Sequence, residues 1–524
     1  YYLCINRTRY RISHTLYLLL HVFALDNNRA YSIHVFHDLL LGDRYMNFKL
    51  GEFTFMDATT QAELVKHKQV KPIELVEAAI KRIESVNPSL NAVILTMYDQ
   101  AREISSGQLE KGTFTGVPFL IKDFLAECEG FEFNEGSEFL RGYVPLHDSE
   151  LVKRYKASGL IFVGKTNTPE FAIGPTTEPR LNGPTHNPWD LSRTAGGSSG
   201  GAAAAVAARM VPIAHGNDAG GSIRIPAGCC GVFGLKPTRG RNPLGPHYGD
   251  LINGLVSEHV LTISVRDSAN ILDISSGPDA GDPYSAPPPK RNYIDEVSTP
   301  PGQLRIAFST QTPLGTKLHP EAIKSVRETA QLCIDLGHQV TEISPNFDAE
   351  TMWRNFTTML AAGFAWSLKD WERRLNKKAT QDTIEPFVWS FMARGNEISG
   401  SDYLLAVQTV QRIARDLAIF FEKYDVWLGP TLGEPPVPLG TFAYSGNDPF
   451  ELRRKMTAFT PFNFISNATG QPSMSVPLYW TDDGLPIGSH FTGKFGDEAT
   501  LFRLAAQLED ARPWANRLPP TVAS

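Results

Sequence analysis

The amino-acid sequence predicts an α/β protein with a largely mixed β-sheet covered by helices, and three observations support this. The chain has 524 residues, enough to bury a large core as one big domain or two. Its composition, 42% hydrophobic and 20% charged, is ordinary for a globular protein. Amphipathic helical segments alternate with short apolar runs along the chain, which is typical of a sheet packed against helices.

The first 50 residues differ from the rest of the chain. Three arginines precede an apolar run at 16–25, which is too short to span a bilayer. A basic start before a short apolar run resembles a secretory signal, but the stretch 27–45 lacks a convincing small-residue cleavage site. We therefore interpret residues 1–50 as a poorly ordered upstream extension that is not native to the protein, with Met46 or Met56 as the true start.

Residues 51–524 are expected to form a single domain, with its core stretch at about 116–241. Apolar residues at helical spacing predict two helices near the start of this domain, at 61–68 and 71–84. Short apolar runs predict strands at 91–95, 116–122, 160–163, 232–235 and 304–308.

The segment 351–424 is expected to be mostly helical and is rich in tryptophan. We expect these aromatic side chains to lie in the core by default, while a minority could line an apolar substrate pocket. The tryptophans are Trp353, Trp366, Trp371 and Trp389.

Serines, glycines and small apolar residues are most concentrated at 194–241. Glycine clusters, such as the one at 196–201, mark positive φ angles or a close approach of the backbone. At 218–222 successive N–H groups would line up beside a hydroxyl, which is the geometry that an oxyanion needs. The alanine run 202–208 predicts a helix directly after the first cluster. Each cluster alone could be a turn or a helix cap, but the two together indicate a catalytic site.

Lys122 follows the apolar run 117–121 and closes a predicted strand. A lysine at such a position is ordinarily a solvated strand end. Because the stretch 194–241 indicates a catalytic site, we interpret Lys122 as a catalytic residue instead. A lysine that acts as a base must lose its proton, which costs roughly 4 to 5 kcal/mol at pH 7 from an unperturbed pKa of about 10.4. Burial can supply that shift, because desolvation disfavours the charged ammonium. The neutral amine could then activate a serine.

A phosphate-loop pattern, G-x-x-x-x-G-K-[ST], is matched letter for letter at 159–166. Its four inner positions are strand-forming apolar residues where a flexible loop is required. Thr168-Pro169 follows where a helix should begin. We therefore reject nucleotide binding.

Two hydrolase motifs other than the one preferred here are present as patterns, but the residues around them do not fit the structure that each motif requires. The stretch 196–200 fits the G-x-S-x-G nucleophile elbow, but 191–195 is too polar for the buried strand that must precede it. Ser222, His215 and Asp218 could form a triad, yet all three lie in one short stretch, whereas a triad needs the histidine brought to the serine with the acid behind it. We expect His215 to be a structural histidine.

Charge and cysteine content limit the expected partners and compartment. The net charge of −6 gives no reason to expect nucleic acid or an anionic membrane as partner. The cysteines are odd in number and widely spaced, so they fit neither a disulfide framework nor a C-x-x-C metal site, and the cytoplasm is the default location. They are Cys4, Cys128, Cys229, Cys230 and Cys333.

The chain resembles the amidase signature enzymes from about Asp57 to about Trp514. A long ordered set of motifs carries this resemblance, so chance agreement is negligible. The matching stretches are 116–123, 164–170, 196–201, 216–227 and 231–238. The resemblance implies the family's α/β fold, a central mixed and twisted β-sheet covered by helices on both faces.

The resemblance also implies a Ser-Ser-Lys triad. Ser222 would be the nucleophile that forms the acyl-enzyme, and Lys122 the base. Ser198 would follow a cis peptide bond after Gly197 and pass the proton between them. No metal or organic cofactor is implied.

Further roles are implied for the residues around the triad. Ser199 would support Lys122 by hydrogen bonding, and Asp218 with Arg224 would brace the loop. The oxyanion hole would be formed by the backbone N–H groups of Ala219, Gly220, Gly221 and Ser222.

Within the family, the stretches 185–191, 212–219 and 235–241 resemble the nylon-oligomer amidases. This implies a small linear or cyclic amide as substrate, or by relation an aryl amide or a carbamate. Substrate choice is expected to depend on 351–424 and the tail loops.

Two alternatives remain open, a glutamine-hydrolysing subunit of a tRNA-dependent amidotransferase and a pseudoenzyme that only binds small molecules. The filled catalytic positions disfavour the pseudoenzyme. The expected partner is the small-molecule substrate, with a homodimer plausible from the family.

Overall fold

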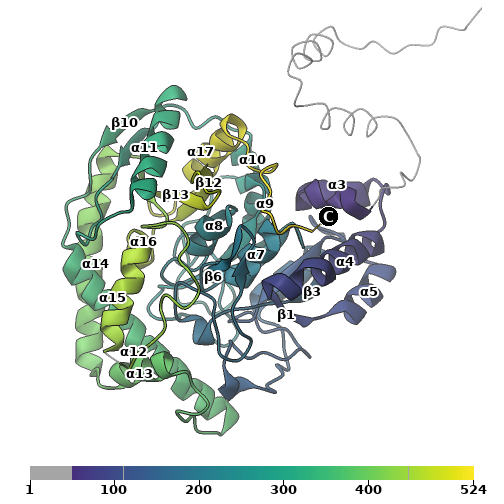
Figure 1. Ribbon diagram of the computed structural model, residues 1–524, viewed down its shortest axis with the longest axis horizontal. Helices are drawn as coiled ribbons and strands as arrows, with labels where there is room; N and C mark the ends of the chain where they lie inside the picture. Colours follow the sequence, from purple (N-terminus) through teal and green to yellow (C-terminus); the bar gives the residue numbers. More distant parts are fainter. Residues whose placement is uncertain (1–49, 110, 447, 524) are drawn as a thin grey trace, which may run out of the picture. The chain divides into compact units, whose positions relative to one another are not determined.

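The computed structural model describes residues 50–109, 111–446 and 448–523. All of them belong to one compact unit, Phe48–Ser524. The interpretation of residues 1–50 as an extension lies outside the described residues except for Leu50, and the domain boundary there stays a prediction. Figure 1 shows the described chain with its helices and strands labelled.

The strands agree with the predicted apolar runs to within a few residues. Each predicted run contains a strand, and further strands complete the sheets. The strands are β1 (Val93–Thr96), β2 (Pro118–Lys122), β3 (Ile161–Thr166), β4 (His186–Asn187), β5 (Asp190–Thr194), β6 (Ile213–Asp218), β7 (Phe233–Lys236), β8 (Ser257–Thr262), β9 (Arg305–Phe308), β10 (Gln339–Glu342), β11 (Val426–Pro430), β12 (Ser473–Trp480) and β13 (Pro486–Gly493).

The helices include the two predicted near the start, and the second continues six residues further, to the buried Leu90. Three short 3-10 helices are η2 (Leu50–Phe55), η3 (Glu138–Leu140) and η4 (Glu170–Ala172). The α-helices are α3 (Ala58–Lys66), α4 (Pro72–Leu90), α5 (Tyr98–Ser106), α6 (Glu150–Ala157), α7 (Gly200–Ala207), α8 (Arg224–Cys230), α9 (Val265–Ser275), α10 (Tyr293–Val297), α11 (Pro320–Asp335), α12 (Ala349–Leu375), α13 (Pro386–Asn396), α14 (Gly400–Lys423), α15 (Pro449–Phe459), α16 (Asn463–Thr469) and α17 (Glu498–Ala511).

The central sheet is mixed and has eleven strands in the order β1-β3-β2-β6-β8-β7-β12-β13-β11-β9-β10. Near one end, β2 pairs in parallel with both β3 and β6, while β6 pairs antiparallel with β8. Strands β4 and β5 form a separate two-stranded sheet. Because Leu120 of β2 is in register with Ala214 of β6, the carboxyl ends of these two parallel strands lie side by side.

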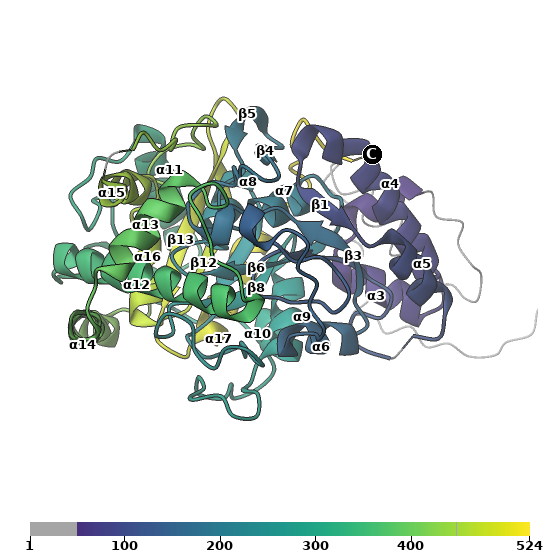
Figure 2. The ribbon, with the colours of Figure 1, turned by 90° about the horizontal axis from the view of Figure 1, so that it is seen from below.

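Helices cover both faces of this sheet, as predicted. Successive residues of a strand point to opposite faces. In β2, Leu120 packs in a core that includes α4 and α7, whereas Phe119 and Ile121 pack in a core that includes α3, α6 and α9. Figure 2 shows α7 and α8 on one side of the sheet and α6 and α9 on the other. Lys122 has the parity of Leu120, so its side chain points towards α7.

The predicted helical segment 351–424 forms most of α12 and all of α13 and α14, and it contributes to a large aromatic core. Residues of α15, α16, β9 and β11 belong to the same core, and Figure 1 shows α12, α13, α14 and α15 gathered at the left of the view. Within the described ranges, no helix has the length and apolar character needed to cross a membrane.

Candidate active site

Lys122 ends β2 as a fully buried lysine with three oxygen neighbours. Its Nζ lies 2.7 Å from Ser198 Oγ, 3.1 Å from Ser199 Oγ and 2.6 Å from Asn217 Oδ1. Burial lowers the pKa of Lys122 to about 7, although more distant carboxylates, Glu258 first among them, act in the opposite direction. The burial expected from the apolar run is therefore present, and it favours the neutral amine.

Lowered pKa alone does not single out this lysine. Burial, followed by the charge of Arg224, also lowers the pKa of Lys236 to about 7. The Lys236 amine, however, donates to the carbonyl of the next residue, Pro237, at 2.7 Å. Among the described residues the Lys236 amine has no hydrogen bond to a serine, so of these two lysines it is Lys122 that has hydroxyl groups beside its amine.

Ser198 and Ser199 come to Lys122 at the start of α7. The Gly197–Ser198 peptide bond is cis, as the resemblance implied. Position 197 needs glycine, because a Cβ there would lie 2.5 Å from the carbonyl oxygen of Thr176. Ser199 is the N-cap residue of α7 but makes no side-chain cap bond. Its hydroxyl instead donates to the carbonyl of Asn217 at 3.3 Å, so the simple cap interpretation is wrong.

Asn217 is a site residue that the sequence analysis did not single out. It lies near the carboxyl end of β6, beside the end of β2. Its Nδ2 donates to the carbonyl of Phe124 at 3.1 Å, which turns Oδ1 towards Lys122. We call Lys122, Ser198, Ser199 and Asn217 the polar floor of the site. The parallel pairing of β2 and β6, which the sequence does not show, brings Asn217 into it.

Asp218 and Arg224 form a buried ion pair next to the polar floor. Arg224 Nη2 and Nε donate to the two carboxylate oxygens at 2.8 and 2.9 Å. Burial would raise the pKa of Asp218, but the charge and hydrogen bonds of Arg224 lower it overall to well below its usual range. The same carboxylate accepts the N–H groups of Gly221 at 2.7 Å and Ile223 at 3.1 Å, which holds the loop in place.

The loop between β6 and α8 carries the candidate nucleophile. The carbonyl of Ser222 accepts the N–H of Ser199 at 3.1 Å. In the described part of the chain the Ser222 hydroxyl makes no hydrogen bond to Ser198. The N–H of Gly221 is taken by Asp218, whereas those of Ala219, Gly220 and Ser222 have no partner among the described residues. Three of the four donors expected in an oxyanion hole are thus available.

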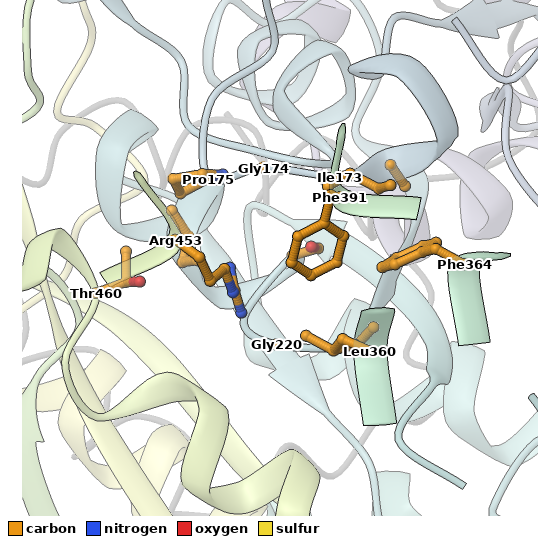
Figure 3. A pocket seen from close by; sticks show the side chains of 13 residues that line it. Ile173, Gly174, Pro175, Gly220, Leu360, Phe364, Phe391, Arg453 and Thr460 are labelled. Atoms are coloured by element: carbon orange, nitrogen blue, oxygen red, sulfur yellow. The ribbon is translucent and has the colours of Figure 1, made fainter. Parts of the chain in front are cut away.

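A cavity of about 40 Å³ opens directly above this loop. Ser222, Ala219 and Gly220 line one side of it. The opposite side is mostly apolar, and we call Ile173, Leu360, Phe364 and Phe391 the apolar wall. Figure 3 shows the two phenylalanine rings facing the cavity, with Arg453 across from them.

The tryptophans of 351–424 do not line this cavity. Trp353 and Trp371 are buried in the aromatic core, as expected. Trp366 is 43% exposed, so the core expectation is wrong for this residue. The cavity is lined instead by phenylalanines of α12 and α13, because those positions face the loop that carries Ser222.

The rejected motifs have other structural roles. Residues 161–166 form β3, and Lys165 is buried beside Asp123 at 3.2 Å, so they form no phosphate-binding loop. The segment before the G-x-S-x-G match is a strand after all, β5, but it is partly exposed in the small sheet rather than buried. His215 is bonded to Glu258 at 2.7 Å and to the N–H of Lys122 at 3.3 Å, which makes it a structural histidine as expected.

One group of side chains in the described chain has the composition of a metal site. The ligand atoms of Glu127, His147 and His247 all lie within 4.8 Å of one another. The Glu127 carboxylate already accepts hydrogen bonds from Arg374 at 2.7 Å and Tyr143 at 3.1 Å. We interpret the group as a contact between loops. The described cysteines, 128, 229, 230 and 333, are buried free thiols.

Comparisons with known proteins point to one family. Residues 74–502 match the family model described as Amidase. The chain is 37% identical over 481 residues to the 6-aminohexanoate-cyclic-dimer hydrolase of Paenarthrobacter ureafaciens, which covers 89% of this chain and 96% of that protein. It is 35% identical over 479 residues to an acylamidase of Rhodococcus erythropolis, covering 89% and 97%.

A solved structure shares the fold. The structure of 6-aminohexanoate cyclic dimer hydrolase complexed with substrate superposes with a TM-score of 0.85 and 36% sequence identity. The match covers 90% of this chain and 99% of that one.

Proposed function

The chain belongs to the amidase signature family and is an amide hydrolase, and on this premise we propose that it cleaves small linear or cyclic amides through an acyl-enzyme on Ser222. The proposal assigns the base to Lys122 and the proton relay to Ser198. It goes beyond the family membership in naming both the residues and the steps.

The hydrogen bonds of the polar floor carry this proposal. Asn217 Oδ1 can only accept, so the Lys122 amine must donate to it. Ser199 directs its own hydrogen to the carbonyl of Asn217, so it too accepts from the amine. A neutral amine has two N–H bonds and one lone pair, and Ser198 is the hydroxyl left to donate to that lone pair. This arrangement directs a proton from Ser198 to Lys122.

The reaction follows from that direction. Ser222 attacks the amide carbonyl while its proton moves through Ser198 to Lys122. The N–H groups of Ala219, Gly220 and Ser222 stabilise the oxyanion. The relay returns the proton to the leaving nitrogen, the amine departs, and water hydrolyses the acyl-enzyme to the acid and the free serine. Contacts such as that between Ser222 and Ser198 often tighten only when substrate binds.

The cavity and the relatives support an amide with an apolar portion. The apolar wall offers aliphatic and aromatic contacts beside Ser222. The two phenylalanine rings of the apolar wall also favour aryl amides as a second substrate class. Carbamates remain a weaker proposal on the same site.

The test is hydrolysis of a panel by the wild-type protein and the Ser222→Ala variant. The panel contains a cyclic aminohexanoate dimer, a p-nitroanilide, a simple primary amide, an aryl carbamate and glutamine. We expect turnover of at least one apolar amide, its loss by a factor of about 10³ or more in Ser222→Ala, and an acyl adduct on Ser222 by mass spectrometry. Ser199→Ala, which keeps the nucleophile and removes one bond to Lys122, is the matched control and should lose only about tenfold.

Two results would reject the proposal. Undiminished turnover by Ser222→Ala would eliminate the nucleophile. Hydrolysis of glutamine alone would favour the amidotransferase subunit, which also requires partner chains.

A further inference from the structure

Arg453 lies on α15 and lines the same cavity as Ser222. Its guanidinium reaches towards the loop of the candidate nucleophile (Figure 3), with Nη2 3.5 Å from the position that a Cβ on Gly220 would occupy. Its Nε is buried and has no hydrogen-bond partner. Across residues 50–109, 111–446 and 448–523, the guanidinium forms no ion pair and no hydrogen bond.

The next residue of the same helix shows what is missing. Arg454 Nη1 binds both carboxylate oxygens of Glu350, at 2.7 and 2.8 Å, and its guanidinium lies over the ring of Trp353 at 4.8 Å. The helix thus supplies two adjacent arginines, one with a carboxylate partner and one that faces the cavity without a partner.

An unpaired guanidinium in such a place is unfavourable for the free protein. Arg453 as a whole is half-buried, but its Nε is removed from water and loses hydration energy, which a close partner of opposite charge and its hydrogen bonds would restore. Burial lowers the pKa of Arg453 to about 10, so the side chain still carries its charge at neutral pH. The planar guanidinium with its several N–H donors matches a carboxylate better than any neutral acceptor.

Resting on the proposed function, we propose that Arg453 binds a carboxylate of the substrate, so that the preferred amides carry a carboxylate a few bonds from the scissile carbonyl. Ser222 and Arg453 line the same cavity, so one bound molecule can contact both groups. The apolar wall then contacts the chain between the carboxylate and the amide, or the group beyond it.

The test measures binding without turnover, by calorimetry on the Ser222→Ala protein. Each ligand pair differs only in replacing a methyl group by a carboxylate. Succinanilic acid is compared with butyranilide, which places the charge on the acyl side. N-butyryl-β-alanine is compared with N-propylbutyramide, which places it on the amine side. The same titrations are repeated with Arg453→Met, Arg453→Lys and Arg454→Met added to Ser222→Ala.

We expect the carboxylate of at least one pair to bind at least about tenfold more tightly than its neutral partner. The preference should vanish in Arg453→Met, persist in part in Arg453→Lys, and persist fully in the control Arg454→Met. Equal affinity within both pairs, no binding of any of the four ligands, or a preference that survives Arg453→Met would overturn the inference. Because binding is measured without turnover, failure of the Ser222 mechanism would appear separately, in the hydrolysis panel.

Discussion

The polar floor and the apolar wall of the site are built on opposite principles. In the polar floor, Lys122 contacts three side-chain oxygens, and the donors and acceptors around it can be assigned almost uniquely. The apolar wall is held by packing of aromatic side chains from α12 and α13, and the Nε of Arg453 beside it has no hydrogen-bond partner within the described ranges. A fully bonded region positions reacting groups, whereas a region with unused contacts is suited to receive a ligand.

The largest expected effect tests whether Lys122 of the polar floor contributes to catalysis or to the stability of the fold. Lys122→Met should lower kcat by about 10³- to 10⁴-fold if Lys122 is the proposed general base. Its free energy of unfolding should change by no more than about 3 kcal/mol, since the removal of a buried amine whose charging is unfavourable offsets the loss of its hydrogen bonds to three buried oxygens. The measurements are amide hydrolysis and urea unfolding at pH 8.

Lys165→Met is the matched control on the neighbouring strand. Lys165 is equally buried but pairs with Asp123 rather than with the serines. Its loss leaves a buried carboxylate unpaired and should cost about 3 to 5 kcal/mol of stability, with kcat of the folded protein within a few-fold. If both variants mainly lowered kcat, or both mainly lowered the free energy of unfolding, the assignment of Lys122 to catalysis and Lys165 to stability would be wrong.

The next effect concerns pH. A base must be neutral, so kcat/KM of the wild type should rise with pH up to about 7 and then level off, following the pKa of Lys122. Asn217→Asp places a carboxylate about where Oδ1 now lies, 2.6 Å from Nζ. The negative charge favours the ammonium and raises the pKa of Lys122. The rising limb should therefore move to higher pH by at least about one unit, with at least about a tenfold loss at pH 7. If the rising part of the pH profile of kcat/KM did not move in Asn217→Asp, this would argue against Lys122 as the base.

The smallest effect concerns the wall. Phe391→Leu should raise KM for an apolar amide about fivefold, from roughly 1 kcal/mol of lost contact, and leave kcat within about twofold. Phe387 packs against Phe391, with ring centroids 5.9 Å apart, but does not line the cavity. Phe387→Leu should therefore destabilise the protein without changing KM. A KM effect in both variants would mean that packing of the wall, rather than contact with substrate, is being measured.

Much of the floor could be predicted because its signals are local. Lys122 ends an apolar run, and the two serines precede an alanine-rich helix, so residue type and spacing place them at element ends. The pairing of Asp218 with Arg224 also lies within one short stretch and is present in the structure. The sequence analysis did not predict that the Gly221 N–H donates to the Asp218 carboxylate, because this hydrogen bond depends on how the loop folds around the carboxylate.

The sequence by itself determined the fold class, because strand patterns and helix periodicity act over a few neighbouring residues. Its ordered set of motifs carried the resemblance to the family, and that resemblance supplied the roles proposed for Lys122, Ser198 and Ser222. Only the tertiary structure decided that Asn217 meets Lys122 and that Phe364 and Phe391 rather than the tryptophans face the cavity. It also decided that Arg453 lines this cavity with an Nε that no described residue bonds. Those contacts join β2 to β6 and α15 to the loop after β6. Contacts between segments distant in sequence depend on how whole helices and strands pack, which no local pattern encodes.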